Sequence, residues 1–193
     1  GSASGMGQAT LKAYVKAGAN VVGMDISNEK GKDISTNADS HGPGTCSFIH
    51  IDVSNEDSVK NAFYLALEEL KTLDVLAHPA AIQGPADASS VKVEDWDNMF
   101  AVNVRGTMLT NQNAFKYMKE NGSGSIINFG SISGLRPEPS ASAYSAAKGA
   151  VHSWTRTAAG TWGKYNVRVN AILPAIATPM YYCLLYTTPS PRD

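Results

Sequence analysis

Short apolar runs alternate with longer amphipathic stretches along most of the chain. The apolar runs are rich in β-branched residues and nearly continuous in apolar character, which is typical of strands buried on both faces of a sheet. We therefore predict five strands, over residues 20–26, 46–53, 73–78, 124–130 and 167–173.

The stretches between these runs carry apolar residues at helical spacing. One begins at Ser54, where Ser54-x-x-Asp57 can form a capping box, and its apolar side chains then share one face from Val59 to Leu70. Strict alternation of strand and helix predicts a Rossmann-like, doubly wound parallel sheet in a three-layer α/β/α arrangement. The other predicted helices cover residues 8–17, 93–119 and 143–164.

Composition narrows the class of protein further. The 193 residues are 43% hydrophobic and 17% charged, with a formal net charge of −1, as expected of one folded domain. The small charge and the lack of a basic block argue against nucleic acid and membrane partners. Two cysteines, Cys46 and Cys183, indicate a cytoplasmic setting, and the four histidines have no metal spacing.

The chain begins with the glycine-rich segment GSASGMG. Gly1 permits a tight turn, while Gly5 and Gly7 leave room for backbone N–H groups at a helix start to face a pyrophosphate. No Gly-Lys-Ser/Thr follows, so the segment is not a Walker loop. In doubly wound folds such a turn follows the first strand, and we expect this chain to lack that strand.

Asp25 ends the strand that follows the glycine turn. A carboxylate at this point can accept both hydroxyls of an adenosine ribose and repels a 2′-phosphate. Neither Ile26 and Ser27 after it nor Ser4 in the turn is basic. If a dinucleotide binds, NAD is therefore favoured over NADP. An aspartate that merely caps a loop is an equally good interpretation of this residue alone.

Tyr144 and Lys148 lie four residues apart on one predicted helix. This spacing stacks them on the same face, where the ammonium is expected to lower the pKa of the phenol. A tyrosine with a lowered pKa is a usable general acid or base. Ser131 follows a predicted strand, at the edge where parallel sheets bind ligands, and Asn103 lies on the preceding helix.

Together these motifs make the chain similar to the classical short-chain dehydrogenases/reductases, in order and spacing, over residues 1 to about 180. The resemblance implies catalytic roles for Asn103, Ser131, Tyr144 and Lys148, the Tyr144 phenol exchanging a proton with the substrate oxygen. Lys148 would hold the nicotinamide ribose, and Asn103 would anchor a water. The implied cofactor-binding residues are Gly1, Ser4, Gly5, Met6, Gly7, Asp25, Ile26, Asp52, Val53, Ala80, Ala81, Tyr144, Lys148, Pro174, Ile176 and Thr178.

The resemblance also implies a function, that of an NAD-dependent oxidoreductase acting on a secondary alcohol or ketone. It further implies that the full-length protein forms homotetramers or homodimers. The alternative is a cofactor-binding relative without turnover, a sensor or scaffold. A serine hydrolase is excluded, because Ile132 stands at the centre of the elbow-like segment GSISG. Two segments depart from the usual sequence of this family, namely His78-Pro79-Ala80-Ala81 and Ala175. We expect both to alter how the cofactor fits.

The end of the chain, CLLYTTPSPRD, has neither helical nor strand periodicity. We interpret residues 181–193 as a foreign tail, similar to translated sequencing adapter, and residues 1–180 as a single partial domain. The expected domain thus lacks its first strand and its C-terminal part.

Overall fold

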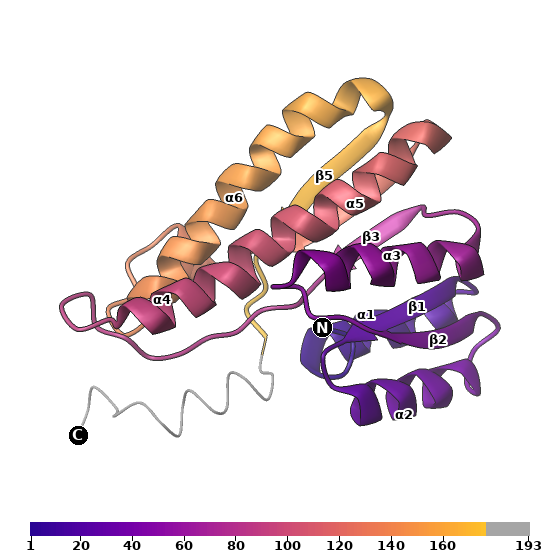
Figure 1. Ribbon diagram of the computed structural model, residues 1–193, viewed down its shortest axis with the longest axis horizontal. Coiled ribbons are helices and arrows are strands. Elements are labelled where there is room, and N and C mark those ends of the chain that lie inside the picture. Colours follow the sequence, from indigo (N-terminus) through magenta and orange to yellow (C-terminus); the bar gives the residue numbers. More distant parts are fainter. Residues whose placement is uncertain (177–193) are drawn as a thin grey trace.

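The computed structural model describes residues 1–176 of the chain and contains all five predicted strands (Figure 1). Each observed strand overlaps its predicted range, with ends shifted by three residues or fewer. The strands are β1 (Asn20–Asp25), β2 (Thr45–His50), β3 (Val75–His78), β4 (Gly124–Phe129) and β5 (Val167–Ile172). The helices are α1 (Gly5–Lys16), α2 (Asn28–Asp39), α3 (Glu56–Leu70), α4 (Val93–Phe100), η1 (Ala101–Arg105), α5 (Gly106–Asn121), η2 (Ile132–Gly134), α6 (Ser142–Trp162) and η3 (Gly163–Tyr165).

Every pair of strands in a ladder is parallel, which confirms the predicted fold class. β1 pairs with β2 in register from Asn20 opposite Thr45. A second sheet has the order β3-β4-β5, so β4 is hydrogen-bonded on both sides. Each parallel pair is joined through helices, as right-handed crossover folds require.

β1 and β3 belong to separate sheets, and a cavity of about 330 Å³ lies between them. Its walls include backbone from both strands together with apolar side chains such as Leu11 and Phe63. Within residues 1–176 the two strands are not hydrogen-bonded to each other. The separation leaves one edge of each strand without ladder bonds.

The largest core cluster joins α3, α5 and α6 to the sheets. Val59, Ala62, Phe63 and Ala66 point inward from α3, as the apolar spacing predicts. Opposite them, Met118 of α5 and the strand residues Ile126 and Val167 are fully buried. Burying side chains of this size contributes about 2 kcal/mol each, so this cluster fixes the helices that carry the site.

The predicted capping box at Ser54 is wrong. α3 begins at Glu56, and Asn55 is its N-cap, accepting a hydrogen bond from the Ser58 backbone N–H at 2.8 Å. Ser54 instead donates its backbone and hydroxyl hydrogens to Asp52. An asparagine caps as well as a serine does, and local hydrogen bonding of Asp52 holds Ser54 outside the helix.

The long helix predicted over residues 93–119 is present but interrupted. A single π-helical turn, η1, separates α4 from α5, and it contains Asn103. Such turns are rare and occur frequently at functional sites. Among residues 1–176, no helix combines the length and the apolar character that a membrane crossing requires.

Candidate active site

The glycine-rich turn leads directly into α1. Ser4 is the N-cap residue, yet its side chain makes no capping hydrogen bond, so backbone N–H groups of the first turn remain available. Gly5 has a φ of 49°, a left-handed conformation that favours glycine. A Cβ on Gly7 would collide with the Gly1 carbonyl oxygen, and one on Gly1 would lie 2.6 Å from the Ala80 nitrogen. The glycines thus bring three backbone segments together at the start of α1.

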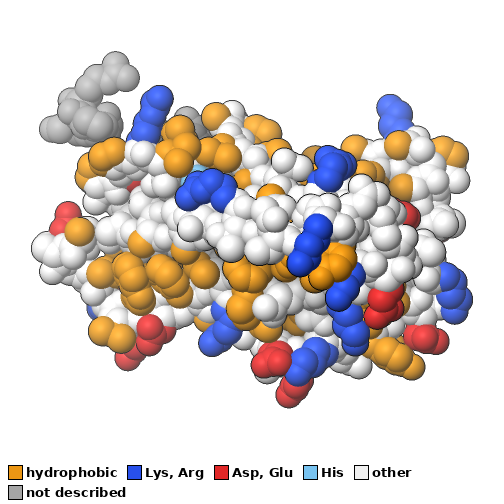
Figure 2. All heavy atoms as spheres, turned by 90° about the horizontal axis from the view of Figure 1, so that it is seen from above, with side chains coloured by type: hydrophobic (Ala, Val, Ile, Leu, Met, Phe, Trp, Pro, Cys, Tyr) orange, Lys and Arg blue, Asp and Glu red, His pale blue; other side chains and the backbone are white. Residues whose placement is uncertain are grey.

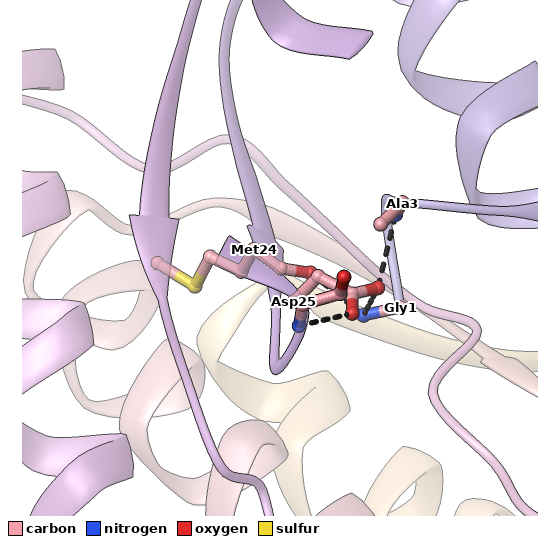
Figure 3. Close-up of polar contacts among 5 residues, drawn as sticks. Gly1, Ala3, Met24 and Asp25 are labelled. Atoms are coloured by element: carbon pink, nitrogen blue, oxygen red, sulfur yellow. Dashed lines mark hydrogen bonds and ion pairs between the residues drawn. The ribbon is translucent and has the colours of Figure 1, made fainter. Parts of the chain in front are cut away.

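Asp25 holds this turn against the end of β1 (Figure 3). Its carboxylate accepts hydrogen bonds from the backbone N–H groups of Ala3 and Ser27, both at 2.9 Å, and lies 3.4 Å from the Gly1 amine. Burial would raise the pKa of Asp25, but the amine and the two N–H groups together hold it below its usual value. The group is therefore ionised at neutral pH.

A cleft of about 300 Å³ opens beside Asp25 and the start of α1. It gathers the predicted cofactor residues of the N-terminal half of the chain around one space. Ile82 and Val102, which the sequence motifs did not single out, also line it, as does Pro79. The predicted residues that line the cleft are Gly1, Ser4, Gly5, Met6, Gly7, Asp25, Ile26, Asp52, Val53, Ala80 and Ala81.

His78 ends β3 next to this cleft but faces the interior. The imidazole is buried, and its Nδ1 lies 3.1 Å from the Thr110 hydroxyl. Burial, followed by the charges of the Gly1 amine and Lys148, lowers the pKa of His78 to about 3. It is a neutral structural histidine, and no group of three His, Cys, Asp or Glu side chains in the described residues is close enough to hold a metal ion.

Tyr144 and Lys148 lie on one face of α6, as the spacing predicts. The Lys148 Nζ is 5.5 Å from the centre of the Tyr144 ring and donates a 2.6 Å hydrogen bond to the Phe129 carbonyl oxygen at the end of β4. Only 3% of Lys148 is exposed. Burial lowers the pKa of Lys148 to about 8, so the ammonium loses its proton far more readily than a surface lysine.

The predicted lowering of the Tyr144 pKa is wrong in this structure. Burial raises the pKa of Tyr144, and a hydrogen bond with the Ser131 side chain offsets only part of this rise. Lys148 turns its ammonium to the Phe129 carbonyl oxygen, which weakens its effect on the phenol. Tyr144 is therefore a protonated phenol at neutral pH, ready to donate rather than to accept a proton.

Ser131 follows β4 and begins the short helix η2. Its hydroxyl accepts a 3.2 Å hydrogen bond from the Ser133 backbone N–H, and its own backbone N–H donates to the His152 Nε2 at 3.2 Å. His152 lies one turn beyond Lys148 on α6. The sequence motifs did not single out this residue, although its spacing from Tyr144 and Lys148, i+8 and i+4, is the signal that could have found it.

Asn103 is 1% exposed and lies in the π-helical turn. Its side-chain amide clamps the backbone of Ile82, accepting from the N–H and donating to the carbonyl oxygen, each at 2.8 Å. The amide also contacts the Met99 sulfur. These bonds tie the loop after β3 to the π-helical turn. Since Ile82 lines the cleft, the Asn103 side chain holds part of the cleft wall in place.

The last predicted cofactor residues are not gathered in the cleft. Pro174 and Ile176 follow β5, and Ile176 is 60% exposed. Thr178 and the predicted foreign tail, 181–193, lie outside the described residues.

The chain is similar to known proteins both in sequence and in structure. The family model for short chain dehydrogenases matches residues 1–182. The chain is 36% identical over 183 residues to momilactone A synthase of Oryza sativa subsp. japonica, covering 93% of this chain and 66% of the relative. It is 35% identical over 193 residues to cyclopentanol dehydrogenase of Comamonas testosteroni, covering 100% and 77%. A short-chain type dehydrogenase/reductase structure from Mycobacterium ulcerans superposes with a TM-score of 0.92 at 26% identity, covering 97% and 70%.

Proposed function

Because the chain belongs to the short-chain dehydrogenase family, we propose that it is an NAD-dependent oxidoreductase that interconverts a secondary alcohol and a ketone. The observation that carries this proposal is the joint placement of Ser131, Tyr144 and Lys148 at the carboxyl end of β4. Ligands of open parallel sheets bind at this edge.

The cleft beside α1 suits a dinucleotide. The available N–H groups at the start of α1 favour a pyrophosphate, since a helix N-terminus attracts anions. The Asp25 carboxylate at the end of β1 would accept ribose hydroxyls and repel a 2′-phosphate, which favours NAD over NADP. When bound, the nicotinamide supplies or accepts the hydride.

The proton step belongs to residues of this chain. In ketone reduction, the Tyr144 phenol donates its proton to the substrate oxygen, and the Ser131 hydroxyl donates a hydrogen bond to the same oxygen. Burial keeps the phenol protonated at neutral pH, which suits this direction. Lys148, with a pKa of about 8, would hold the nicotinamide ribose. Its ammonium would stabilise the remaining phenolate only to the extent that it turns away from the Phe129 carbonyl oxygen.

The substrate is inferred from the relatives. Because one relative carries the name cyclopentanol dehydrogenase, we infer a small cyclic ketone, and cyclopentanone is the first test substrate.

We also propose a homo-oligomer that uses the groove between α4–α5 and α6. Phe100, Val104, Met108 and Trp154 line this groove beside Arg105. Hydrophobic side chains also gather in broad patches on the face seen in Figure 2. Apolar patches of this kind mark interaction surfaces.

The test is a titration with NADH and, separately, NADPH, followed by cyclopentanone reduction at a saturating level of the tighter cofactor. We expect tighter binding of NADH and turnover that Tyr144→Phe abolishes while the cofactor affinity is kept. Tyr117→Phe, on α5, is the matched control and should leave both unchanged. Binding without turnover in the unsubstituted chain would favour the sensor or scaffold, and binding of neither cofactor would contradict the proposal.

A further inference from the structure

We propose that His152 is a positioning residue that fixes Ser131 for proton transfer, by accepting the Ser131 backbone N–H while its imidazole is neutral. This assignment rests on the function proposed above. The carrying observation is the 3.2 Å hydrogen bond from the Ser131 nitrogen to the His152 Nε2.

The imidazole occupies a slot that two glycines create. A Cβ on Gly130 would collide with the His152 Nε2, and one on Gly134 would lie 2.8 Å from its Cε1. Only 6% of His152 is exposed. The loop that presents Ser131 is therefore wrapped around this one ring, and its path depends on where the ring lies.

The hydrogen bond also sets the protonation state of the ring. A backbone N–H can only donate, so Nε2 must be unprotonated and Nδ1 must carry the hydrogen. The Nδ1 atom is buried and has no hydrogen-bond partner among residues 1–176. A second proton on the ring would sit on Nε2 and face the Ser131 N–H. Two donors cannot bond to each other, so the bond to Ser131 would break.

Charges around the ring favour the neutral form. Burial lowers the pKa of His152, and the positive charges of Arg156 and Lys148 on the same helix lower it further. Residues 129–134, which pack against the ring from β4 and η2, contain no titratable side chain. The neutral ring is thus maintained at ordinary pH, and the contact is lost only in acid.

The contact between His152 and Ser131 affects Tyr144 through Ser131. Ser131 is held at its N–H by His152, and its side chain lowers the pKa of the Tyr144 phenol against the effect of burial. A shift of the Ser131 backbone would weaken this effect on the phenol. His152 therefore acts on the phenol without touching it.

The experiment compares His152→Leu with His152→Gln. The glutamine Oε1 lies as many bonds from the backbone as Nε2, so this variant keeps an acceptor without a titratable group. The first measurement is the pKa of Tyr144, followed by NMR of ¹³Cζ-labelled tyrosine and assigned with Tyr144→Phe. We expect a higher pKa in His152→Leu and an unchanged one in His152→Gln.

The second measurement is the pH profile of cyclopentanone reduction with NADH. We expect an acid limb below the ordinary histidine range in the unsubstituted chain and none in His152→Gln. His152→Leu should lose roughly tenfold or more in kcat at every pH, since misplacement of this size is costly. If the kcat of His152→Gln falls as far as that of His152→Leu, or if neither variant changes the pKa of Tyr144, then His152 only fills space. Either result would overturn the inference.

A measurement on the unsubstituted protein covers the case in which the variants do not fold. The ¹⁵N spectrum of labelled histidine should show the Nδ1–H tautomer, and the Ser131 amide shift should follow the His152 titration. An Nε2–H tautomer would overturn the inference. If these signals behave as expected but no ketone is reduced, the proposed function fails while the positioning contact stands.

Discussion

Lys148→Met is expected to make the protein more stable at neutral pH while removing the proposed reductase activity. Lys148 is 3% exposed, and burial lowers its pKa from 10.5 to about 8. At 1.36 kcal/mol per pKa unit, holding this charge in the fold costs about 3 kcal/mol at pH 7. Methionine keeps the apolar stem but loses the hydrogen bond to Phe129, a loss of about 1 kcal/mol. The net gain is about 2 kcal/mol.

The stability that Lys148→Met gains over the unsubstituted protein must shrink as pH rises. Between pH 8 and 10.5 the unfolded chain holds the Lys148 proton more tightly than the folded chain. The free energy of unfolding of the unsubstituted protein therefore rises with pH in this window. About 1 kcal/mol of the penalty remains at pH 10, where the two proteins should be nearly equal in stability.

Urea unfolding followed by circular dichroism at pH 7 and pH 10 measures this difference. Lys12→Met is the control, because Lys12 is exposed on α1 and its loss should leave the unfolding free energy almost unchanged at both pH values. A Lys148→Met variant that is less stable than the unsubstituted protein by the same amount at both pH values would refute the reasoning. The ammonium would then be solvated rather than buried.

Three further predictions concern the cleft and the end of β3. Asp25→Asn should bring the dissociation constants of NADH and NADPH closer together by roughly tenfold, and an unchanged ratio would show that this carboxylate does not select the cofactor. His78→Leu should remove an acid sensitivity. Because the pKa of His78 is lowered from 6.5 to about 3, the unsubstituted protein loses up to about 5 kcal/mol of stability as pH falls through this window. About 3 kcal/mol of this is lost between pH 7 and pH 4, and urea unfolding at these two pH values should show a smaller loss in the variant. Gly7→Ala should destabilise the protein by about 1–3 kcal/mol, since its methyl group meets the Gly1 carbonyl, and a thermal melt unchanged from that of the unsubstituted protein would contradict this placement.

The sequence predicts the strands well because they are short runs of β-branched residues, a pattern that leaves few alternatives. It predicts the shared face of Tyr144 and Lys148 because helical spacing alone decides that face. It does not predict the protonation state of Tyr144, since burial and the direction in which Lys148 donates are tertiary properties. The capping of α3 by Asn55 was missed for a related reason, namely that Ser54 is held by Asp52.

The role of His152 also depends on tertiary structure. In the sequence it is a histidine without metal spacing, and only the folded loop brings the Ser131 N–H to its ring. The π-helical turn at Asn103 has no signal in the apolar spacing, because five residues in a π-turn disturb the helical period too little.

The separation of β1 from β3 has a consequence for how the molecule fluctuates. Successive N–H groups along a strand point to opposite edges, so alternate amides of β1 are bonded to β2 while the others border the cavity. Hydrogen exchange along β1 should therefore alternate between slow and fast from one residue to the next. β4, bonded on both sides, should be slow throughout. The β1 amides that border the cavity should thus exchange before those bonded to β2.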